Sequence, residues 1–226
     1  MKNHIVSLIA RILFSICVPL FLLTFCISIA VNSGALYHHS FTAYNIPEVT
    51  GISLPELDKA ADELIHYFSS GEKTLDIIVI KDGKPFALFN ERELGHLADV
   101  KTLFQFSYKV LLGTFIYMTA FILASVFWWK DRRNIGLGLF WGGALSLLLM
   151  IVLGIVIAVD FDGFFLQFHQ LSFANDLWLL DPAHDYLIMM FPQGFWFDAA
   201  LYIAVGALAG AVITGLTGWL MLKPKR

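Results

Sequence analysis

The chain has 226 residues, of which 58% are hydrophobic and 15% charged, and its formal net charge is −3. Soluble domains average about 45–50% apolar and about 25% charged residues, so this composition excludes a typical soluble or disordered protein and favours a membrane protein. The slightly acidic balance also argues against nucleic acid as a partner, because phosphate binding requires a concentrated basic surface. Aromatic residues make up 15% of the chain, which is more than interfacial aromatic belts alone require.

Four apolar segments are long enough to cross a membrane, since a spanning helix needs about 20 residues to cover the hydrocarbon core. These segments contain no Asp, Glu, Lys, Arg or His; they are residues 12–31, 110–129, 135–159 and 199–222. We therefore predict an α-helical membrane protein with four transmembrane helices, and no ion pathway or haem site inside the bundle. The first span is predicted to be an uncleaved anchor, because its apolar run exceeds the roughly 7–15 residues of a signal peptide.

Eight basic residues lie at the chain ends and in the connection between the second and third spans. They are Lys2, Arg11, Lys130, Arg132, Arg133, Lys223, Lys225 and Arg226, and they meet a single acid, Asp131. The positive-inside rule then places both termini in the cytoplasm. The predicted order is 1–31 (N-terminus and first helix), 32–109 (extracellular cap), 110–129 (second helix), 130–134 (cytoplasmic turn), 135–159 (third helix), 160–198 (extracellular loop) and 199–226 (fourth helix and C-terminus).

The segment 32–109 is long enough to fold as a small α+β extracellular cap. Ser53 and Glu56 have the spacing of a capping box, in which each residue bonds the other's backbone at a helix start. Apolar residues at helical spacing follow, so we predict an amphipathic helix that stops at Gly71.

A β-hairpin and a second helix are predicted in the rest of this segment. The residue types of 75–80 and 85–89 favour strands, and Asp82-Gly83 between them is a strong hairpin-turn signal. Residues 90–108 have apolar residues at helical spacing and predict a helix that leads into the second span.

The segment 160–198 contains 11 aromatic residues and no Lys or Arg. We expect it to lie on the bilayer surface, to pack under the cap, or to line a pocket for acyl chains or lipid head groups. Asp181-Pro182 predicts the start of a short helix that ends before Pro192. The acidic residues of this loop mark where the chain leaves the bilayer, and they would attract cationic groups such as a protonated amine.

The sequence has none of the motifs for nucleotide, serine-hydrolase or zinc chemistry, namely GxxxxGK[ST], GxSxG and HExxH. The candidates for chemistry are therefore histidines near the outer interface. His96 shares a helical face with Arg92, Glu93 and Asp99. That face is either a solvated charged surface or an arrangement in which an acid fixes the tautomer of His96 and makes it a base.

His169 follows a run of phenylalanines that ends at Phe168, just after the third span. It is either an interfacial histidine exposed to head groups or a desolvated imidazole, which stays neutral and can act as a general base. His184 and the acids around it could in principle bind a hard cation, but no recognised spacing supports a metal site there, and helix capping accounts for Asp181.

Two strings, NERELGHLADVK and FHQLSFANDLWLLDPAHDYLIMMFP, resemble a bacterial four-span integral membrane family that includes the lipoprotein intramolecular transacylase. The resemblance covers nearly the whole chain and implies that His96 and His169 are catalytic. It implies an acyltransferase that moves the sn-2 acyl chain of a diacylglyceryl group to the α-amine of the N-terminal Cys of a lipoprotein, giving the lyso-form. No metal, nucleotide or other cofactor is implied.

Several other residues of these strings are expected to support the site or bind substrate. They are Asn90, Glu91, Arg92, Glu93, Asp99, Phe168, Asn175, Asp176, Trp178 and Asp181. The implied partners are a diacylated lipoprotein and membrane lipids, and the implied location is the bacterial cytoplasmic membrane with the active site facing outward. We expect His169 to accept the proton of the amine and His96 to stabilise the oxyanion or protonate the leaving oxygen, although the reverse assignment stays open.

Two other functions stay open from the sequence. A non-enzymatic lipid-binding or scaffold protein predicts that the rings of His96 and His169 lie more than about 10 Å apart. An ester hydrolase would use the same two histidines but release the acyl chain to water.

Overall fold

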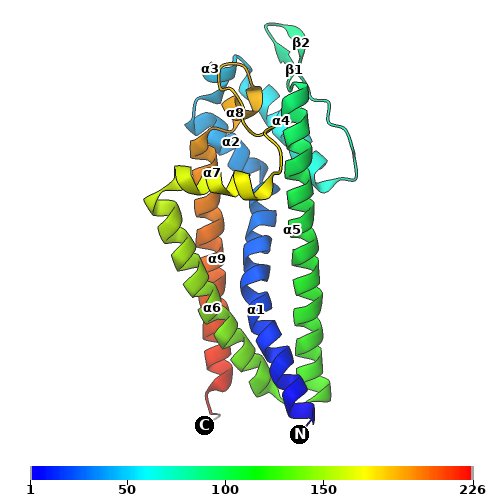
Figure 1. Ribbon diagram of the computed structural model, residues 1–226, viewed down its shortest axis with the longest axis vertical. Helices are drawn as coiled ribbons and strands as arrows, with labels where there is room; N and C mark the ends of the chain where they lie inside the picture. Colours follow the sequence, from blue (N-terminus) through cyan, green and yellow to red (C-terminus); the bar gives the residue numbers. More distant parts are fainter. Residues whose placement is uncertain (1, 225–226) are drawn as a thin grey trace. The chain divides into compact units, whose positions relative to one another are not determined.

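A computed structural model describes residues 2–224, with side chains from residue 5 onward, and shows a mainly helical protein with one small sheet (Figure 1). Its elements are α1 (Lys2–Val31), α2 (Gly34–Ala43), α3 (Ile46–Thr50), α4 (Leu54–Ser69), β1 (Ile78–Lys81), β2 (Lys84–Ala87), α5 (Glu91–Leu123), the π-helix η1 (Ala124–Trp128), α6 (Arg132–Val159), α7 (Phe161–Ser172), α8 (Tyr186–Met190) and α9 (Gln193–Leu222). The chain divides into two compact units, which we describe separately.

Four helical segments of the described chain are long and apolar enough to cross a membrane, which confirms the predicted fold class. They are Ile5–Val31, Glu91–Trp128, Arg132–Val159 and Gln193–Leu222. The second segment has 38 residues, or about 57 Å at 1.5 Å per residue, whereas the hydrocarbon core is only about 30 Å thick. Its first part, residues 91–109, carries six charged residues. The apolar remainder is therefore the membrane span, and His96 lies outside it.

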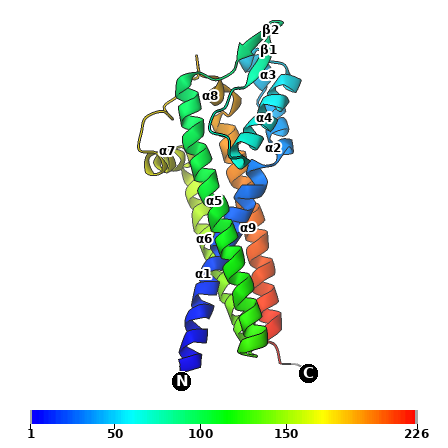
Figure 2. The ribbon, with the colours of Figure 1, turned by 90° about the vertical axis from the view of Figure 1, so that its right-hand side faces the viewer.

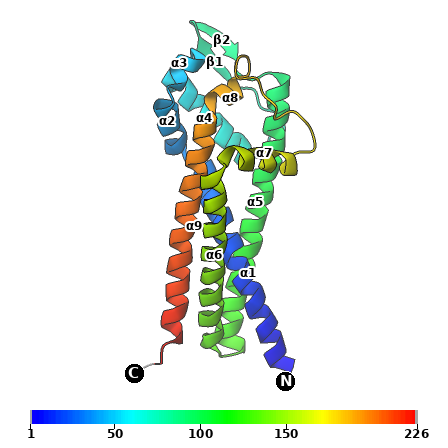
Figure 3. The same cartoon turned by 60° about the vertical axis from the view of Figure 1, so that its left-hand side comes forward.

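Unit 1 comprises residues 1–28, 107–159 and 201–226, and it contains the apolar parts of α1, α5, α6 and α9 side by side (Figure 3). Its buried side chains include Phe14, whose ring centroid lies 4.6 Å from that of Phe121. Small residues let the helices approach closely: a Cβ on Gly143 of α6 would lie 2.7 Å from Cα of Gly215 in α9. Such glycine contacts are typical of membrane helices, whose association depends on close packing.

Unit 2 comprises residues 29–106 and 160–200. The helices α2, α3 and α4 lie on one side of the first turns of α5, and α7 lies on the other (Figure 2). Its core holds Phe41, Leu57 and Leu64, each at most 1% exposed. Aromatic rings of the loop 160–198 join this core, since the ring of Phe191 contacts that of Phe41. Part of the aromatic excess therefore packs against the predicted cap.

The amphipathic helix predicted after Ser53 is α4, but its predicted capping box is wrong. Ser53 is the N-cap residue, yet its side chain makes no capping hydrogen bond. Oε2 of Glu56 instead accepts a hydrogen bond from the backbone N–H of Ile80 in β1, at 2.7 Å. A contact between distant elements has replaced the local one, so this carboxylate fixes the strand to the helix.

The predicted hairpin is confirmed, with strands shorter than expected. Strands β1 and β2 are antiparallel, with Ile80 opposite Pro85 and Lys81 opposite Lys84. Asp82 and Gly83 have φ values of 52° and 73°. Two consecutive positive φ values define the turn that matches the twist of a two-residue hairpin, and Gly and Asp tolerate them best.

The helix predicted to start at Asp181-Pro182 starts later. The helix is α8, and its N-cap residue is Asp185. Asp181 lies in a turn, where its Oδ1 accepts a hydrogen bond from the N–H of Ala183 at 2.9 Å, while Oδ2 of Asp185 accepts one from the N–H of Asp181 at 2.7 Å. These bonds satisfy the backbone locally, so no helix is needed at Pro182. Helices α2, α3 and α7 were not predicted.

Candidate active site

The two candidate histidines lie together in unit 2. His96 lies on the second turn of α5 and His169 on α7, which runs crosswise to α5 (Figures 1 and 3). Their ring centroids are 6.0 Å apart, with an angle of 32° between the ring planes. This distance is within the reach of one bridging atom or water. A non-enzymatic lipid-binding or scaffold protein predicted a separation of more than about 10 Å between the two rings, and the observed distance is shorter.

Aromatic rings surround the histidine pair. The ring of His169 lies 4.4 Å from Phe165, 5.5 Å from Phe168 and 5.2 Å from Trp178, measured between centroids. The ring of Phe173 contacts both histidines, at 5.0 Å from His96 and 5.5 Å from His169. The sequence named Phe168 and Trp178 but missed Phe165 and Phe173. Phe165 could have been found, since a residue four positions before His169 shares its helical face.

The surroundings of His169 fix the tautomer of its ring. Nδ1 lies 2.8 Å from the carbonyl oxygen of Phe165. A carbonyl oxygen can only accept, so Nδ1 carries the proton and donates it, which leaves Nε2 with a free lone pair when the ring is neutral. Burial lowers the pKa of His169, although the bond to Phe165 opposes this shift. The lowered pKa favours the neutral ring, in which Nε2 is the unprotonated nitrogen.

His96 is more deeply buried and is also neutral. Its side chain is 7% exposed. Its pKa is lowered to about 4, mainly by burial and also by the neighbouring His169, while the carboxylate of Asp99 opposes the shift. Nδ1 is buried without a hydrogen-bond partner among the described residues. Nε2 is then the nitrogen that is left to contact a substrate.

A capping box starts the helix that carries His96. Oδ1 of Asn90 accepts hydrogen bonds from the N–H groups of Arg92 and Glu93, at 2.9 and 3.1 Å. Oε2 of Glu93 accepts one from the N–H of Asn90 at 2.8 Å, which completes the reciprocal pattern. The sequence Asn-Glu-Arg-Glu has the required spacing, so this box was detectable. Asn90 and Glu93 therefore fix where α5 begins and, with it, the position of His96.

The same two residues hold the distant segment 185–187. Oε1 of Glu93, whose side chain is 1% exposed, accepts a hydrogen bond from the N–H of Leu187 at 2.6 Å. Nδ2 of Asn90 donates to Oδ1 of the buried Asp185 at 2.8 Å. Burial raises the pKa of Glu93, and its backbone hydrogen bonds oppose that shift. One buried carboxylate thus organises two parts of unit 2.

The segment after α7 is fastened to α5 around His96. Arg92 donates from Nη2 to the carbonyl oxygen of Asp176 at 2.5 Å, and Nδ2 of Asn175 donates to Oδ2 of Asp99 at 2.8 Å. Leu177 packs on Gly95, where an added Cβ would lie 2.8 Å from Cδ1 of Leu177. Because Gly95 precedes His96, this contact holds the segment of Trp178 beside the histidine pair.

Two residues that were expected to support the site, Glu91 and Asp181, have no contact with the histidine pair among the interactions described. Glu91 is exposed at the start of α5. Asp181 bonds Nδ1 of His184 as well as the backbone of Ala183. Over residues 5–224 the structure shows no group of three or more His, Cys, Asp or Glu side chains that could hold a metal ion.

Comparison with known proteins identifies the family. A family model described as lipoprotein intramolecular transacylase Lit matches residues 12–196, which is most of the chain. The chain belongs to this family. A member of the lipoprotein intramolecular transacylase family is a membrane acyltransferase, and both matching strings of the sequence fall inside the aligned range.

Further comparisons give a related sequence and three solved structures of similar fold. An uncharacterised protein of Aquifex aeolicus (strain VF5) is 31% identical over 150 residues, which is 65% of this chain and 64% of that protein. The structure of the lipoprotein intramolecular transacylase Lit from Bacillus cereus superposes with a TM-score of 0.84 at 22% identity, covering 97% of each chain. Two variants of that protein, with one histidine changed to Arg or Ala, superpose with TM-scores of 0.79.

Proposed function

We propose that this membrane acyltransferase moves the sn-2 acyl chain of a diacylated lipoprotein to the α-amine of its own N-terminal Cys, with His96 and His169 as the acid–base pair. The observation that carries the proposal is the pair of neutral imidazoles 6.0 Å apart inside a group of aromatic rings. Membership of the lipoprotein intramolecular transacylase family supports the substrate class.

His169 acts as the base in this scheme. Its Nδ1–H is held by the carbonyl of Phe165, so Nε2 offers a lone pair to the amine. The amine nitrogen attacks the carbonyl carbon of the sn-2 ester and forms a C–N bond, while its proton passes to Nε2. A lowered pKa keeps His169 unprotonated at neutral pH, which a base requires.

His96 acts on the tetrahedral intermediate in this scheme. Neutral His96 has a single N–H group, which donates a hydrogen bond to the negative oxygen of the tetrahedral intermediate and stabilises it. The intermediate then expels the sn-2 oxygen of the glycerol, which takes up a proton as the C–O bond breaks. The proton that left the amine returns through the histidine pair, so the products are an amide and a free hydroxyl group, and the enzyme ends unchanged.

Confinement of the substrate supplies most of the rate enhancement. A well-placed base contributes about 10²–10⁴-fold, whereas holding reactive groups in attack geometry removes roughly 7–11 kcal/mol of barrier. The rings of Phe165, Phe168, Phe173 and Trp178 are the surface against which the acyl chains fold. The carboxylate of Asp99, three residues after His96 on α5, attracts the protonated amine before it loses its proton.

The active site is proposed to face the extracellular side. The basic residues of the predicted cytoplasmic side and the absence of Lys and Arg from residues 160–198 support this orientation. Cysteine substitution at exposed Glu91, followed by labelling of intact cells with a membrane-impermeant thiol reagent, tests it. Labelling only after cell lysis would contradict the outward orientation.

Tandem mass spectrometry tests the reaction, because the product is an isomer of the substrate and only fragmentation locates the acyl chain. The chain is expressed in a host that makes diacylated lipoproteins, and the N-terminal peptide of one lipoprotein is fragmented. N-acylated lyso-form is expected with the unchanged chain and with His66→Asn, whose imidazole is exposed and lies outside the pair. His96→Asn and His169→Asn should each lower its formation by about 10²-fold or more. Full activity of either variant refutes the paired mechanism, and free fatty acid without N-acylation indicates a hydrolase.

A further inference from the structure

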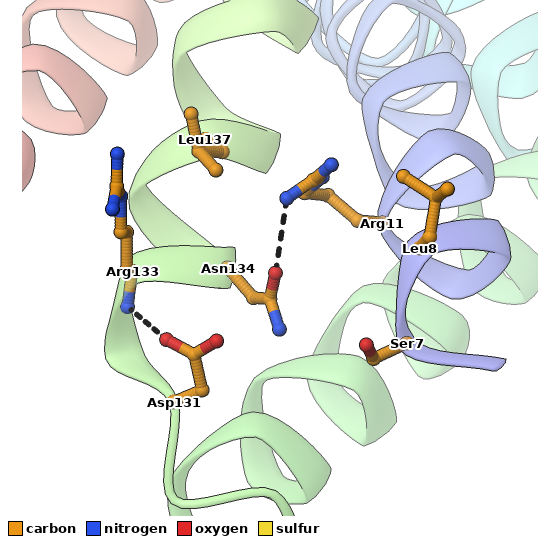
Figure 4. A pocket seen from close by; sticks show the side chains of 7 residues that line it. All are labelled: Ser7, Leu8, Arg11, Asp131, Arg133, Asn134 and Leu137. Carbon is orange, nitrogen blue, oxygen red and sulfur yellow. Dashed lines mark hydrogen bonds between the residues drawn. The ribbon is translucent and has the colours of Figure 1, made fainter. Parts of the chain in front are cut away.

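A polar pocket lies in unit 1, between the first turns of α1 and α6 (Figure 4). Its volume is about 340 Å³, and its polar lining includes Ser7, Arg11, Asp131, Arg133 and Asn134. Figure 4 shows Arg11 extending from α1 toward Asn134 on α6. The pocket shares no residue with the histidine pair, so the proposed acyl transfer does not account for it.

Arg11 is the unusual member of this lining. It is half-buried in the apolar helix α1, and Nη1 donates a hydrogen bond to Oδ1 of Asn134 at 3.1 Å. No Asp or Glu among the described residues forms an ion pair with it. An arginine in a membrane helix is costly without a counter-charge or access to the interface. The remaining N–H groups of its guanidinium therefore require an anion or water.

The one acid of the lining does not provide that counter-charge. Oδ1 of Asp131 accepts a hydrogen bond from the backbone N–H of Arg133 at 3.0 Å, which caps the turn before α6. Among the described residues Asp131 forms no ion pair with the guanidinium of Arg11 or Arg133, so both guanidinium groups keep N–H donors for a ligand. The pocket thus has two arginines against one carboxylate, and its net charge is positive.

The pocket lies at the end of unit 1 where the sequence predicts that the helices leave the bilayer. The starts of α1 and α6 and the end of α9 lie at one end of unit 1 (Figures 1 and 3). Three further cations, Lys130, Arg132 and Lys223, belong to the chain segments at this end. A basic pocket between apolar helices where they leave the bilayer is the usual setting for anionic head groups.

We propose that this pocket binds the phosphate of an anionic glycerophospholipid. A guanidinium offers two parallel N–H donors that match two phosphate oxygens, and Arg11 is already oriented by Asn134. The amide Nδ2 of Asn134 is turned away from Arg11 in Figure 4 and offers a further donor. Free inorganic phosphate has the same chemistry, so an experiment has to separate the two sources.

Native mass spectrometry of the full-length protein in lipid nanodiscs measures this binding. The wild-type chain should retain phosphatidylglycerol in preference to phosphatidylcholine. Arg11→Gln and Arg133→Gln should each weaken phosphatidylglycerol binding by about fivefold or more, because each loses a direct charge-assisted contact with the phosphate. Arg132→Gln is the matched control, because it removes the same charge from the same turn without lining the pocket, and it should leave binding unchanged.

Three results would overturn the proposal. Equal binding by wild type and Arg133→Gln removes the pocket as the site, and this variant decides even where Arg11→Gln does not fold, since the side chain of Arg133 is exposed. An equal loss in Arg132→Gln indicates diffuse charge attraction. Complete displacement of the lipid by equimolar inorganic phosphate indicates that free phosphate, not a lipid, is the ligand.

Discussion

Replacing Glu93 should destabilise the protein more than replacing any other acid near the histidine pair. Its carboxylate is 1% exposed and accepts hydrogen bonds from the N–H groups of Asn90 and Leu187. Each buried N–H left without an acceptor costs about 1–3 kcal/mol. Glu93→Ala leaves the buried N–H of Leu187 without an acceptor, removes the capping bond to Asn90 and opens a cavity, so the free energy of unfolding should fall by about 3–5 kcal/mol. Glu93→Gln keeps the shape but replaces one acceptor by a donor, so about 1–3 kcal/mol should be lost.

Thermal unfolding in nanodiscs, followed by tryptophan fluorescence, measures these losses. For a chain of this size 1 kcal/mol corresponds to about 2–4 °C in Tm, so Glu93→Ala should lower Tm by about 10 °C and Glu93→Gln by about half as much. Glu91→Gln is the control, because Glu91 is exposed two positions earlier, and its Tm should be unchanged. If the Tm values of Glu93→Ala and Glu91→Gln are equal, the carboxylate does not hold the segment 185–187 to α5.

Three further outcomes are expected. Burial lowers the pKa of His96 to about 4, while the unfolded ring keeps its usual value near 6.5. The free energy of unfolding should therefore fall as the pH drops below 6.5, by about 2 kcal/mol between pH 7 and 5. His96→Gln should lose less over the same range when unfolding is measured at both pH values. Gly143→Ala should lower Tm by several degrees, since its Cβ would meet the backbone of α9, whereas Gly154→Ala, which would meet nothing within 4 Å, should not; equal shifts would exclude the close helix contact. Trp178→Ala should reduce formation of the lyso-form while leaving Tm nearly unchanged, and undiminished activity would exclude its ring from substrate positioning.

Sequence patterns predicted the features that depend on neighbouring residues. The four apolar helices follow from segment hydropathy, and the hairpin follows from Asp82-Gly83, because both signals are local. The capping box at Ser53 failed because Glu56 bonds Ile80, which is 24 positions away, and no local pattern contains that partner. Helix α7 was not predicted, because the aromatic residues of this segment fitted three locations equally well: on the bilayer surface, packed under the cap, or lining a pocket.

The candidate site was predicted in part for a different reason. Resemblance to the family, and not spacing, paired His96 with His169, since 73 residues separate them. The aromatic neighbours Phe165 and Phe173 were not among the expected supporting residues, although their positions four residues before and after His169 place them near its ring. Asn90 and Glu93 were expected at the site as supporting residues, and the structure gives them a specific structural task.

The order in which the chain is made limits when this enzyme can begin to work. His96 precedes the second span and His169 follows the third, so the ribosome must add 73 residues after one histidine before the other exists. At about 5–20 residues per second this interval is roughly 4–15 s. Leu187, the partner of Glu93, comes 18 residues later still. A newly inserted chain therefore lacks one of the two proposed catalytic histidines for seconds after the first has been made.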